Sequence, residues 1–517
     1  MAETTSIQLV CYTFLFVLLV TVLRLKLKLR RGAGNLNLPP GPWALPLIGH
    51  MHFLLGALPH QAMHRLARRY GPVMLIHLGH VPTLVLSSPE AAREVMKVHD
   101  AVFADRPVYA TADIFTYGGQ NISFARHDSR HWKAVRKLCA VELLSPGRVR
   151  SFRPVREEEA ALLVRSIASS MPALGPVVVN VSELVKVMMN DVIMRVSVGD
   201  RCEQRAVYLE ELDRGLAIMS GFNLSDLFPA SRLARALGGG TLRAALEVRE
   251  RIQSIVDAMV RDHKRAMESS LEAAQADVGG HEREDILTTL LRFQRDGGMG
   301  ITLTNENVNG VLFDIFSAGS ETTATTTIWA MSELMKSQRI MAIAQSEVRR
   351  VLHGKTKVME ADIDGRLQYL KMVIKETFRL HPPVPLLLPR LCKEPSKIMG
   401  YDVPRGATVL VNVWAIGKGE ESWADASDFK PERFESDIVD YSGTDFRFLP
   451  GGAGRRMCPG MMFGVSNIEM ALASLLYHFD WKLPSGENPD KLDMAEGYGM
   501  TTPRKTELLL EAIPFVT

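Results

Sequence analysis

A single cysteine on a glycine-rich, basic loop is the feature of this sequence that most strongly suggests chemistry. The stretch FLPGGAGRRMCPG runs from Phe448 to Gly460 and carries Cys458 shortly after two arginines. Nearby positive charge favours a thiolate, and free backbone N–H groups and the start of a following helix also favour an anion. These features fit a thiolate ligand to a metal centre. A nucleophilic cysteine stays open, although its histidine would have to come from elsewhere in the chain.

Two further segments could support this loop through charge. KETFRL places Glu376 and Arg379 three residues apart, on one face of a helix. FKPERF offers Arg433 on a loop. Such a pair is usually a solvated surface pair of little energetic value. A buried network of all three residues would instead lock the loop that holds Cys458.

A long apolar helix is predicted around FSAGSETTATTTIWA, residues 316–330. Ala318 and Gly319 remove bulk, so that a flat ligand or a substrate could approach the backbone. Threonine hydroxyls can bond to backbone carbonyls and bend a helix. Glu321 and Thr322 would then place an acid and a hydroxyl at the bend. The alternative is a core helix that tolerates glycine and carries a surface glutamate.

HWKAVRK places Trp132 and Arg136 four residues apart, on one helix face. An indole N–H and a guanidinium together can hold a carboxylate. An ordinary amphipathic helix with a basic surface is the alternative.

The elements that position these residues are mostly helical. Residues 73–88 form two apolar runs broken at Gly79 and Pro82, which predicts a β-hairpin. From there to about residue 370 the apolar spacing is mostly helical. After residue 384, prolines and short β-rich runs become frequent, and helix returns after Gly460. The fold class is therefore α+β, mostly α-helical, with a minor β-sheet region.

Composition excludes several classes of protein. The net charge is +3, but five of the 61 basic residues lie between Arg24 and Arg31, so the remainder is slightly negative against 58 acidic residues. Nucleic acid is thus not an expected partner, since phosphate binding needs a sustained basic face. The five cysteines contain no closely spaced pair, which argues against a disulfide framework or a structural zinc site.

The amino terminus is predicted to anchor the chain in a membrane. Residues 7–23 carry no charge and are just long enough to span a bilayer as a helix. Basic residues follow at once, which places the downstream chain in the cytosol. We divide the chain into an anchor with its basic stop sequence (1–31), a proline-rich hinge (32–50) and a catalytic domain (51–517). Residues 221–240 could make a second membrane contact, or be buried against the core.

In this order and spacing, AGSETT, ETFR, PERF and GAGRRMCPG resemble the signatures of the cytochromes P450, which are haem-thiolate monooxygenases. The resemblance covers nearly the whole chain and implies the P450 fold, preceded by a transmembrane helix. It implies haem b (iron protoporphyrin IX) as cofactor, with O2 and NADPH as co-substrates. One atom of O2 would be inserted into a hydrophobic small molecule.

The resemblance also assigns roles. Cys458 would bind the haem iron as a thiolate, whose electron donation favours O–O cleavage. Thr322 would hydrogen-bond the oxygen substrate, and Glu321 would help to deliver protons. The positions that match those holding the haem propionates are Trp132, Arg136, Arg390 and Arg456. The structural network would consist of Glu376, Arg379 and Arg433.

The sequence departs from the family at one position. The family has a phenylalanine seven residues before the cysteine, where this chain has Gly451. Phe448 lies three residues too early to be the same residue. The family phenylalanine shields the sulfur and the cofactor, so its absence affects the solvation of the sulfur, the reduction potential and the rigidity of the loop.

Finer detail resembles the plant microsomal branch that oxidises specialised metabolites. Stretches such as VELLS and GFNLSDLFP suggest a terpenoid substrate, while a phenolic or other compound stays open. The expected pocket segments are mostly apolar, as a hydrophobic substrate requires. They comprise residues 108–123, 312–322, 384–388 and 500–502.

The resemblance further implies an endoplasmic reticulum membrane protein that spans once, with its catalytic domain in the cytosol. An NADPH-cytochrome reductase, a flavoprotein, would supply electrons, and Arg130, Lys133 and Lys137 could form its docking patch. Two alternatives remain: a haem-thiolate isomerase or dehydratase that does not use O2, and a non-enzymatic membrane haem protein. The presence of Glu321 and Thr322 favours the monooxygenase.

Overall fold

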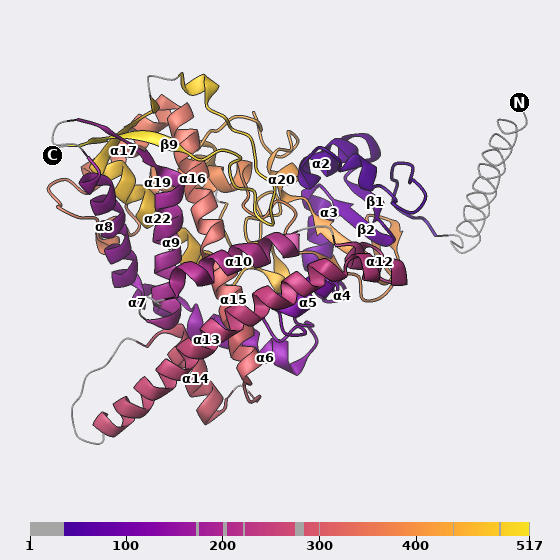
Figure 1. The fold of residues 1–517 in the computed structure, drawn as a ribbon. Coiled ribbons are helices and arrows are strands. Elements are labelled where there is room, and N and C mark those ends of the chain that lie inside the picture. Colours follow the sequence, from indigo (N-terminus) through magenta and orange to yellow (C-terminus); the bar gives the residue numbers. More distant parts are fainter. Residues whose placement is uncertain are drawn as a thin grey trace, which may run out of the picture.

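A computed structural model of the chain describes residues 36–171, 175–199, 204–220, 223–274, 284–298, 300–437, 439–484 and 488–515. Helices dominate these residues, and short strands form small sheets, as the sequence predicts (Figure 1). The predicted anchor at residues 7–23 lies outside the described residues. Within those ranges, no helix combines the length and the hydropathy needed to cross a bilayer.

The main sheet has the strand order β1-β2-β7-β4. The predicted hairpin is present as β1 (Val73–Leu78) and β2 (Val81–Leu86), which pair antiparallel. β7 (Thr408–Val411) lies parallel to β2 and pairs Thr408 with Thr83, while β4 (Arg390–Leu391) closes the order. The other sheets are formed by β3 (Val177–Asn180), β9 (Leu509–Pro514) and β8 (Phe479–Lys482), and by β5 (Ser396–Ile398) and β6 (Tyr401–Val403).

The helices fill most of the remaining chain. They are α2 (Pro59–Tyr70), α3 (Pro89–Arg93), α4 (Asp100–Phe103), α5 (Ala110–Phe115), α6 (Arg130–Leu138), α7 (Pro146–Ser151), α8 (Arg153–Ser169), α9 (Val181–Val198), α10 (Arg205–Ser220), α11 (Leu224–Leu227), α12 (Arg232–Leu237), α13 (Gly239–Ala274), α14 (Ile286–Asp296), α15 (Asn305–Gly319), α16 (Glu321–Lys336), α17 (Gln338–Val351), α18 (Glu360–Ile363), α19 (Gln368–Leu380), α20 (Val413–Gly417), α21 (Arg433–Ser436) and α22 (Met461–His478).

The core lies around α16, which packs against α9, α19 and α22 (Figure 1). Every residue from Thr323 to Met335 is buried, because nearly all of them are apolar or carry small hydroxyls. The exception is Glu333, whose carboxylate is hydrogen-bonded to the ring of His381 at 2.7 Å. The hydroxyls of Thr326 and Thr327 donate to backbone carbonyls one turn earlier, so their burial leaves no donor unpaired.

The predicted bend separates α15 from α16 at Ser320. Three hydroxyls reach back across this break to carbonyls four residues earlier. Thr322 donates to Ala318 at 2.7 Å, Thr323 to Gly319 at 2.7 Å, and Ser320 to a carbonyl of the preceding turn at 3.1 Å. The side chains therefore take up carbonyls of the bent helix, as the sequence suggests.

Residues 36–50 of the proposed hinge are hydrogen-bonded to the catalytic body. The backbone N–H of Asn37 donates to Asp402 at 2.8 Å, and the carbonyl of Pro40 accepts from Leu75 at 2.9 Å. The division into hinge and catalytic domain stays a prediction.

Candidate active site

Cys458 lies at the end of a tight loop that directly precedes α22. Gly454 has a φ of 70°, and a Cβ at this position would lie 2.2 Å from the carbonyl oxygen of Met96, so only glycine fits. The N–H of Cys458 donates to the carbonyl of Gly451 at 2.9 Å and closes the loop. The helix begins at Met461, where the sequence predicts it.

The sulfur of Cys458 faces an internal cavity. Much of its side chain is not covered by protein, but this surface lines a cavity of about 280 Å³ rather than the exterior. Burial away from bulk water raises the pKa of Cys458, whereas the N–H of Gly460 and the charge of Arg136 lower it. The cation that favours the thiolate thus comes from α6, not from the arginines of the loop itself. A metal bound here would displace the thiol proton.

The four residues predicted to hold propionates all line this cavity: Trp132, Arg136, Arg390 and Arg456. Arg136 donates to the carbonyl of Met457 at 2.5 Å, and Arg456 donates to that of Ala104 at 2.7 Å. The guanidinium of Arg456 also lies over the ring of Trp132, 4.6 Å from its centre. The indole N–H of Trp132 donates to a backbone carbonyl at 3.1 Å.

Arg106 joins this group, although no sequence motif pointed to it. It is buried, lines the same cavity and donates to three backbone carbonyls at 2.7–2.9 Å. Burial lowers its pKa, and the charges of Arg456 and Arg390 lower it further. Among the described residues, Arg106, Arg136 and Arg456 form no ion pair. Neutral acceptors alone satisfy these three guanidiniums, whereas Arg390 forms an ion pair with Asp100 at 2.9 Å. The rim therefore carries an excess of positive charge, which fits the two propionate carboxylates of haem.

The bend between α15 and α16 forms another part of the wall, through Ala318, Gly319 and Thr322. A Cβ at Gly319 would lie 2.4 Å from the Cδ1 atom of Ile193 on α9. An alanine here would have to displace the end of the Ile193 side chain, so the glycine favours close packing of the two helices and also leaves room on the cavity side.

Glu321 and Thr322 point in different directions, because consecutive helical residues lie about 100° apart. Thr322 lines the cavity, whereas Glu321 is not among the described residues that line it. The Glu321 carboxylate instead accepts a hydrogen bond from the hydroxyl of Thr501 at 2.5 Å. Burial raises the pKa of Glu321, and this hydrogen bond lowers it.

Asp314 is a buried acid in the cavity wall that no sequence motif marks, although it lies within the expected segment 312–322. It accepts from the amide of Asn121 at 2.7 Å and from the N–H groups of Ile122 and Ser123 at 2.7 and 3.0 Å. Burial raises the pKa of Asp314 to about 6 against these hydrogen bonds. The contacts fix the segment that follows α5 against α15.

Glu376, Arg379 and Arg433 meet in one buried network. Arg379 holds both carboxylate oxygens of Glu376, at 2.7 and 2.8 Å, and Arg433 donates to one of them at 2.9 Å. The side chains of Glu376 and Arg379 have no exposed surface. The network reaches the cysteine loop through Phe434, whose ring contacts that of Phe448 at 5.6 Å.

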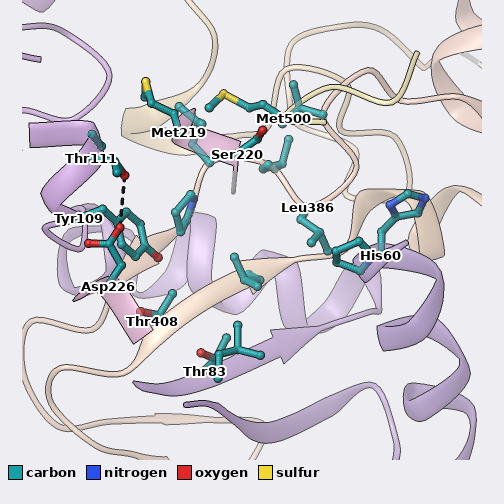
Figure 2. A pocket seen from close by; sticks show the side chains of 18 of the residues that line it. His60, Thr83, Tyr109, Thr111, Met219, Ser220, Asp226, Leu386, Thr408 and Met500 are labelled. Atoms are coloured by element: carbon teal, nitrogen blue, oxygen red, sulfur yellow. Dashed lines mark hydrogen bonds between the residues drawn. The ribbon is translucent and has the colours of Figure 1, made fainter. Parts of the chain in front are cut away.

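A second cavity of about 260 Å³ adjoins the first. Figure 2 shows Thr83 and Thr408 on its strand side and Met219 and Met500 on the other. The two threonines are neighbours because β2 and β7 pair in this register. Both cavities are lined by Val384, Leu387 and Leu388. Together they draw on all four expected pocket segments: 108–123, 312–322, 384–388 and 500–502.

The polar end of this outer cavity ties two segments together (Figure 2). Asp226 of α11 accepts from the N–H of Ala110 at 2.6 Å and from the hydroxyl of Thr111 at 3.2 Å. Tyr109 lies beside them, and burial raises its pKa to about 12. These contacts hold α11 over the cavity.

The far side of α6 carries the predicted reductase patch. Arg130, Lys133 and Lys137 are all exposed and share one face, with no ion pair to any described residue. Trp132 and Arg136 of the same helix face the cavity.

Comparison with known proteins matches the sequence model of one family, Cytochrome P450, to residues 39–510. Dolabradiene monooxygenase of Zea mays is 45% identical over 480 residues, covering 92% of each chain. Ent-isokaurene C2/C3-hydroxylase of Oryza sativa subsp. japonica is 46% identical over 470 residues, covering 90% of each. A solved zebra fish cytochrome P450 with progesterone superposes with a TM-score of 0.73 at 24% identity, covering 88% of this chain and 99% of that one.

Proposed function

The chain belongs to the cytochrome P450 family, and on this premise we propose how its residues divide the work of catalysis. It is a cytochrome P450 monooxygenase that uses haem b, molecular oxygen and electrons from NADPH. We assign Cys458 as the iron ligand. The observation that carries this assignment is that Cys458 faces a cavity whose rim holds Arg106, Arg136 and Arg456, which form no ion pair with any described residue.

Bound haem supplies the redox chemistry that activates O2, and thiolate donation favours O–O cleavage. The protein's own residues hold the group and manage protons. We assign the propionates to Trp132, Arg136, Arg390 and Arg456, and we add Arg106.

Proton delivery on the distal side is assigned to Thr322. Its hydroxyl lies in the cavity wall and donates to the carbonyl of Ala318 at 2.7 Å, while its oxygen keeps two lone pairs that can accept hydrogen bonds. To deliver a proton, the hydroxyl would turn its O–H from this carbonyl towards the cavity as its oxygen accepts another proton. Glu321 lies behind this wall beside Thr501. Burial makes the Glu321 carboxyl easier to protonate, which suits a proton donor that acts through its neighbours.

The substrate is proposed to be a hydrophobic plant metabolite, with a terpenoid preferred. The outer cavity is lined mainly by apolar side chains, and it connects along Val384 and Leu387 to the cavity that contains Cys458. The names of two relatives, dolabradiene monooxygenase and ent-isokaurene hydroxylase, support a terpenoid.

We further propose an NADPH-cytochrome reductase as electron donor, docked on the basic face of α6. Arg130, Lys133 and Lys137 lie directly behind residues of the proposed haem site, so the route for an electron is short. Exchanging Arg130 and Lys137 for glutamate should slow reduction by the reductase several-fold. It should leave reduction by dithionite unchanged, and equal slowing of both would contradict the docking role.

Single-pass anchoring in the endoplasmic reticulum membrane, with the catalytic domain in the cytosol, is part of the proposal. Large apolar side chains are exposed at Trp43, Leu47 and Leu55 near the amino terminus, and at Leu233 and Leu237 on α12. Their exposure supports a surface that faces the membrane. Figure 1 shows α12 on the same side as β1 and β2. Within the segment suggested as a second membrane contact, Leu224 is exposed and Leu227 is buried.

Removing residues 1–31 should release most of the protein from microsomes.

The ligand assignment is tested with carbon monoxide. Purified ferrous protein with carbon monoxide should show the red-shifted Soret band of thiolate ligation. Cys458→Ala should abolish this band, while the control Cys392→Ala, a buried cysteine away from the cavity, should keep it. A red-shifted band in Cys458→Ala would refute the assignment.

Activity is tested by incubation with reductase, NADPH and a library of terpenoids and phenolics, with products read by mass spectrometry. Thr322→Ala should lower the ratio of product to NADPH consumed, whereas Thr322→Ser should retain it. Turnover without NADPH would favour the isomerase or dehydratase alternative.

A further inference from the structure

Gly451 is a glycine because of space and not because of backbone conformation. Gly452 and Gly454 have φ values of 68° and 70°, which side chains rarely tolerate, but Gly451 has no such constraint. What disfavours a side chain here is the crowding by its neighbours. A Cβ on Gly451 would lie 3.0 Å from the Sδ atom of Met461 and 3.2 Å from the Cβ atom of Cys458.

The thioether of Met461 therefore occupies the space beside the cysteine that a side chain at position 451 would need. Met461 is the first residue of α22, is partly buried, and lines the same cavity as Cys458. A methionine suits this place because its unbranched, polarizable chain fills irregular gaps.

Phe448 does not provide this cover. Its ring is buried against Phe434 and Tyr441, with ring centres 5.6 and 5.9 Å away. It is absent from the described residues that line the cavity. The aromatic residue nearest in sequence to position 451 thus belongs to the core and not to the surroundings of the sulfur.

We propose that Met461 covers the sulfur of Cys458 on the side of Gly451, and that Gly451 and Met461 form a sterically matched pair. The inference rests on the proposed role of Cys458 as the iron ligand. Met461 is here a positioning residue, since it acts on the ligand and not on the substrate. The apolar surroundings of a metal site limit water access and so set its reduction potential.

The test compares the haem-loaded wild type with Met461→Ala, Gly451→Phe, the double variant and Met462→Ala. Met462 is the matched control, because it is the neighbouring methionine and is 53% exposed. Two quantities are measured: the rate at which the red-shifted ferrous carbon monoxide band is lost on mild warming, and the midpoint reduction potential.

Met461→Ala should open the sulfur to water. We expect band loss to become several-fold faster and the potential to shift positive, because water stabilises the extra negative charge of the reduced state. Gly451→Phe alone should also speed band loss, since its ring collides with Met461. The double variant should return towards wild type, because the ring then fills the vacated space. Met462→Ala should behave as wild type.

Two results would overturn the proposal. One is a Met461→Ala protein with the band lifetime and potential of Met462→Ala, and the other is a double variant that shows no recovery relative to Met461→Ala. If Met461→Ala does not retain haem, Met461→Leu and Met461→Gln are compared instead. Leucine should preserve the lifetime of the band, and glutamine should shorten it. Equal lifetimes would refute the proposal that Met461 covers the sulfur. Absence of the red-shifted band in the wild type would instead refute the assignment of Cys458.

Discussion

Glu376→Gln is expected to destabilise the protein severely while hardly changing the volume of the side chain. The Glu376 carboxylate is buried and accepts four hydrogen bonds of 2.7–2.9 Å, from Arg379 (two), Arg433 and the N–H of Lys430. A glutamine oxygen can keep the three donors that share one carboxylate oxygen. The glutamine NH2 group would then face the Nε–H of Arg379, and two donors would meet.

The cost follows from the buried charge. Glutamine would leave the guanidiniums of Arg379 and Arg433 without their shared counter-charge, and the side chain of Arg379 has no exposed surface. Removing one partner of a buried ion pair costs about 3–5 kcal/mol. Native proteins are stable by about 5–15 kcal/mol in total. We therefore expect a loss of about 3–5 kcal/mol in the free energy of unfolding.

Urea denaturation of the haem-loaded protein, followed by tryptophan fluorescence and by the Soret band, measures this loss. Glu435→Gln is the matched control, since Glu435 is exposed on α21 close to Arg433. The control should change the free energy of unfolding by less than about 0.5 kcal/mol. If Glu376→Gln lost less than about 1 kcal/mol, the network would not hold buried charge as described.

Two further predictions concern acid stability and helix packing. Burial raises the pKa of Glu496, but the hydrogen bond from His60 and the charge of Lys418 outweigh burial and bring the pKa to about 2, below the ordinary 4.5. The resulting stabilisation of about 3 kcal/mol is complete above pH 4.5 and is lost as the pH falls towards 2. The urea midpoint should therefore decline less steeply with falling pH in Glu496→Gln than in the wild type. An equal slope in the two proteins would contradict this. Gly319→Ala places a Cβ 2.4 Å from the Cδ1 atom of Ile193, so Tm should fall by an amount equivalent to about 1–3 kcal/mol, and Ile193→Val should restore part of it. An unchanged Tm for Gly319→Ala would contradict this prediction, because it would show that Ile193 on α9 moves aside at no cost in stability.

The sequence alone predicts how residues lie relative to one another when they are close along the chain. The glycine-rich loop before Cys458, the start of a helix after Gly460, and the shared face of Glu376 and Arg379 each follow from spacing within a few residues. Turn and helix geometry repeats with a fixed period, so these relations hold before the chain folds. The bend at Ser320, next to Glu321 and Thr322, is predictable for the same reason.

Only the tertiary structure could decide which distant groups meet. Arg106 joins the rim because its segment lies against β4 and its guanidinium donates to the carbonyls of Leu388 and Pro389. Glu321 turns towards Thr501 instead of the cavity. Gly319 needs its small size because Ile193 approaches from another helix, and Gly451 because Met461 does. Spacing along a chain fixes the direction of a side chain relative to its own element. What that side chain touches depends on how the elements pack together, and packing is settled by the whole core at once.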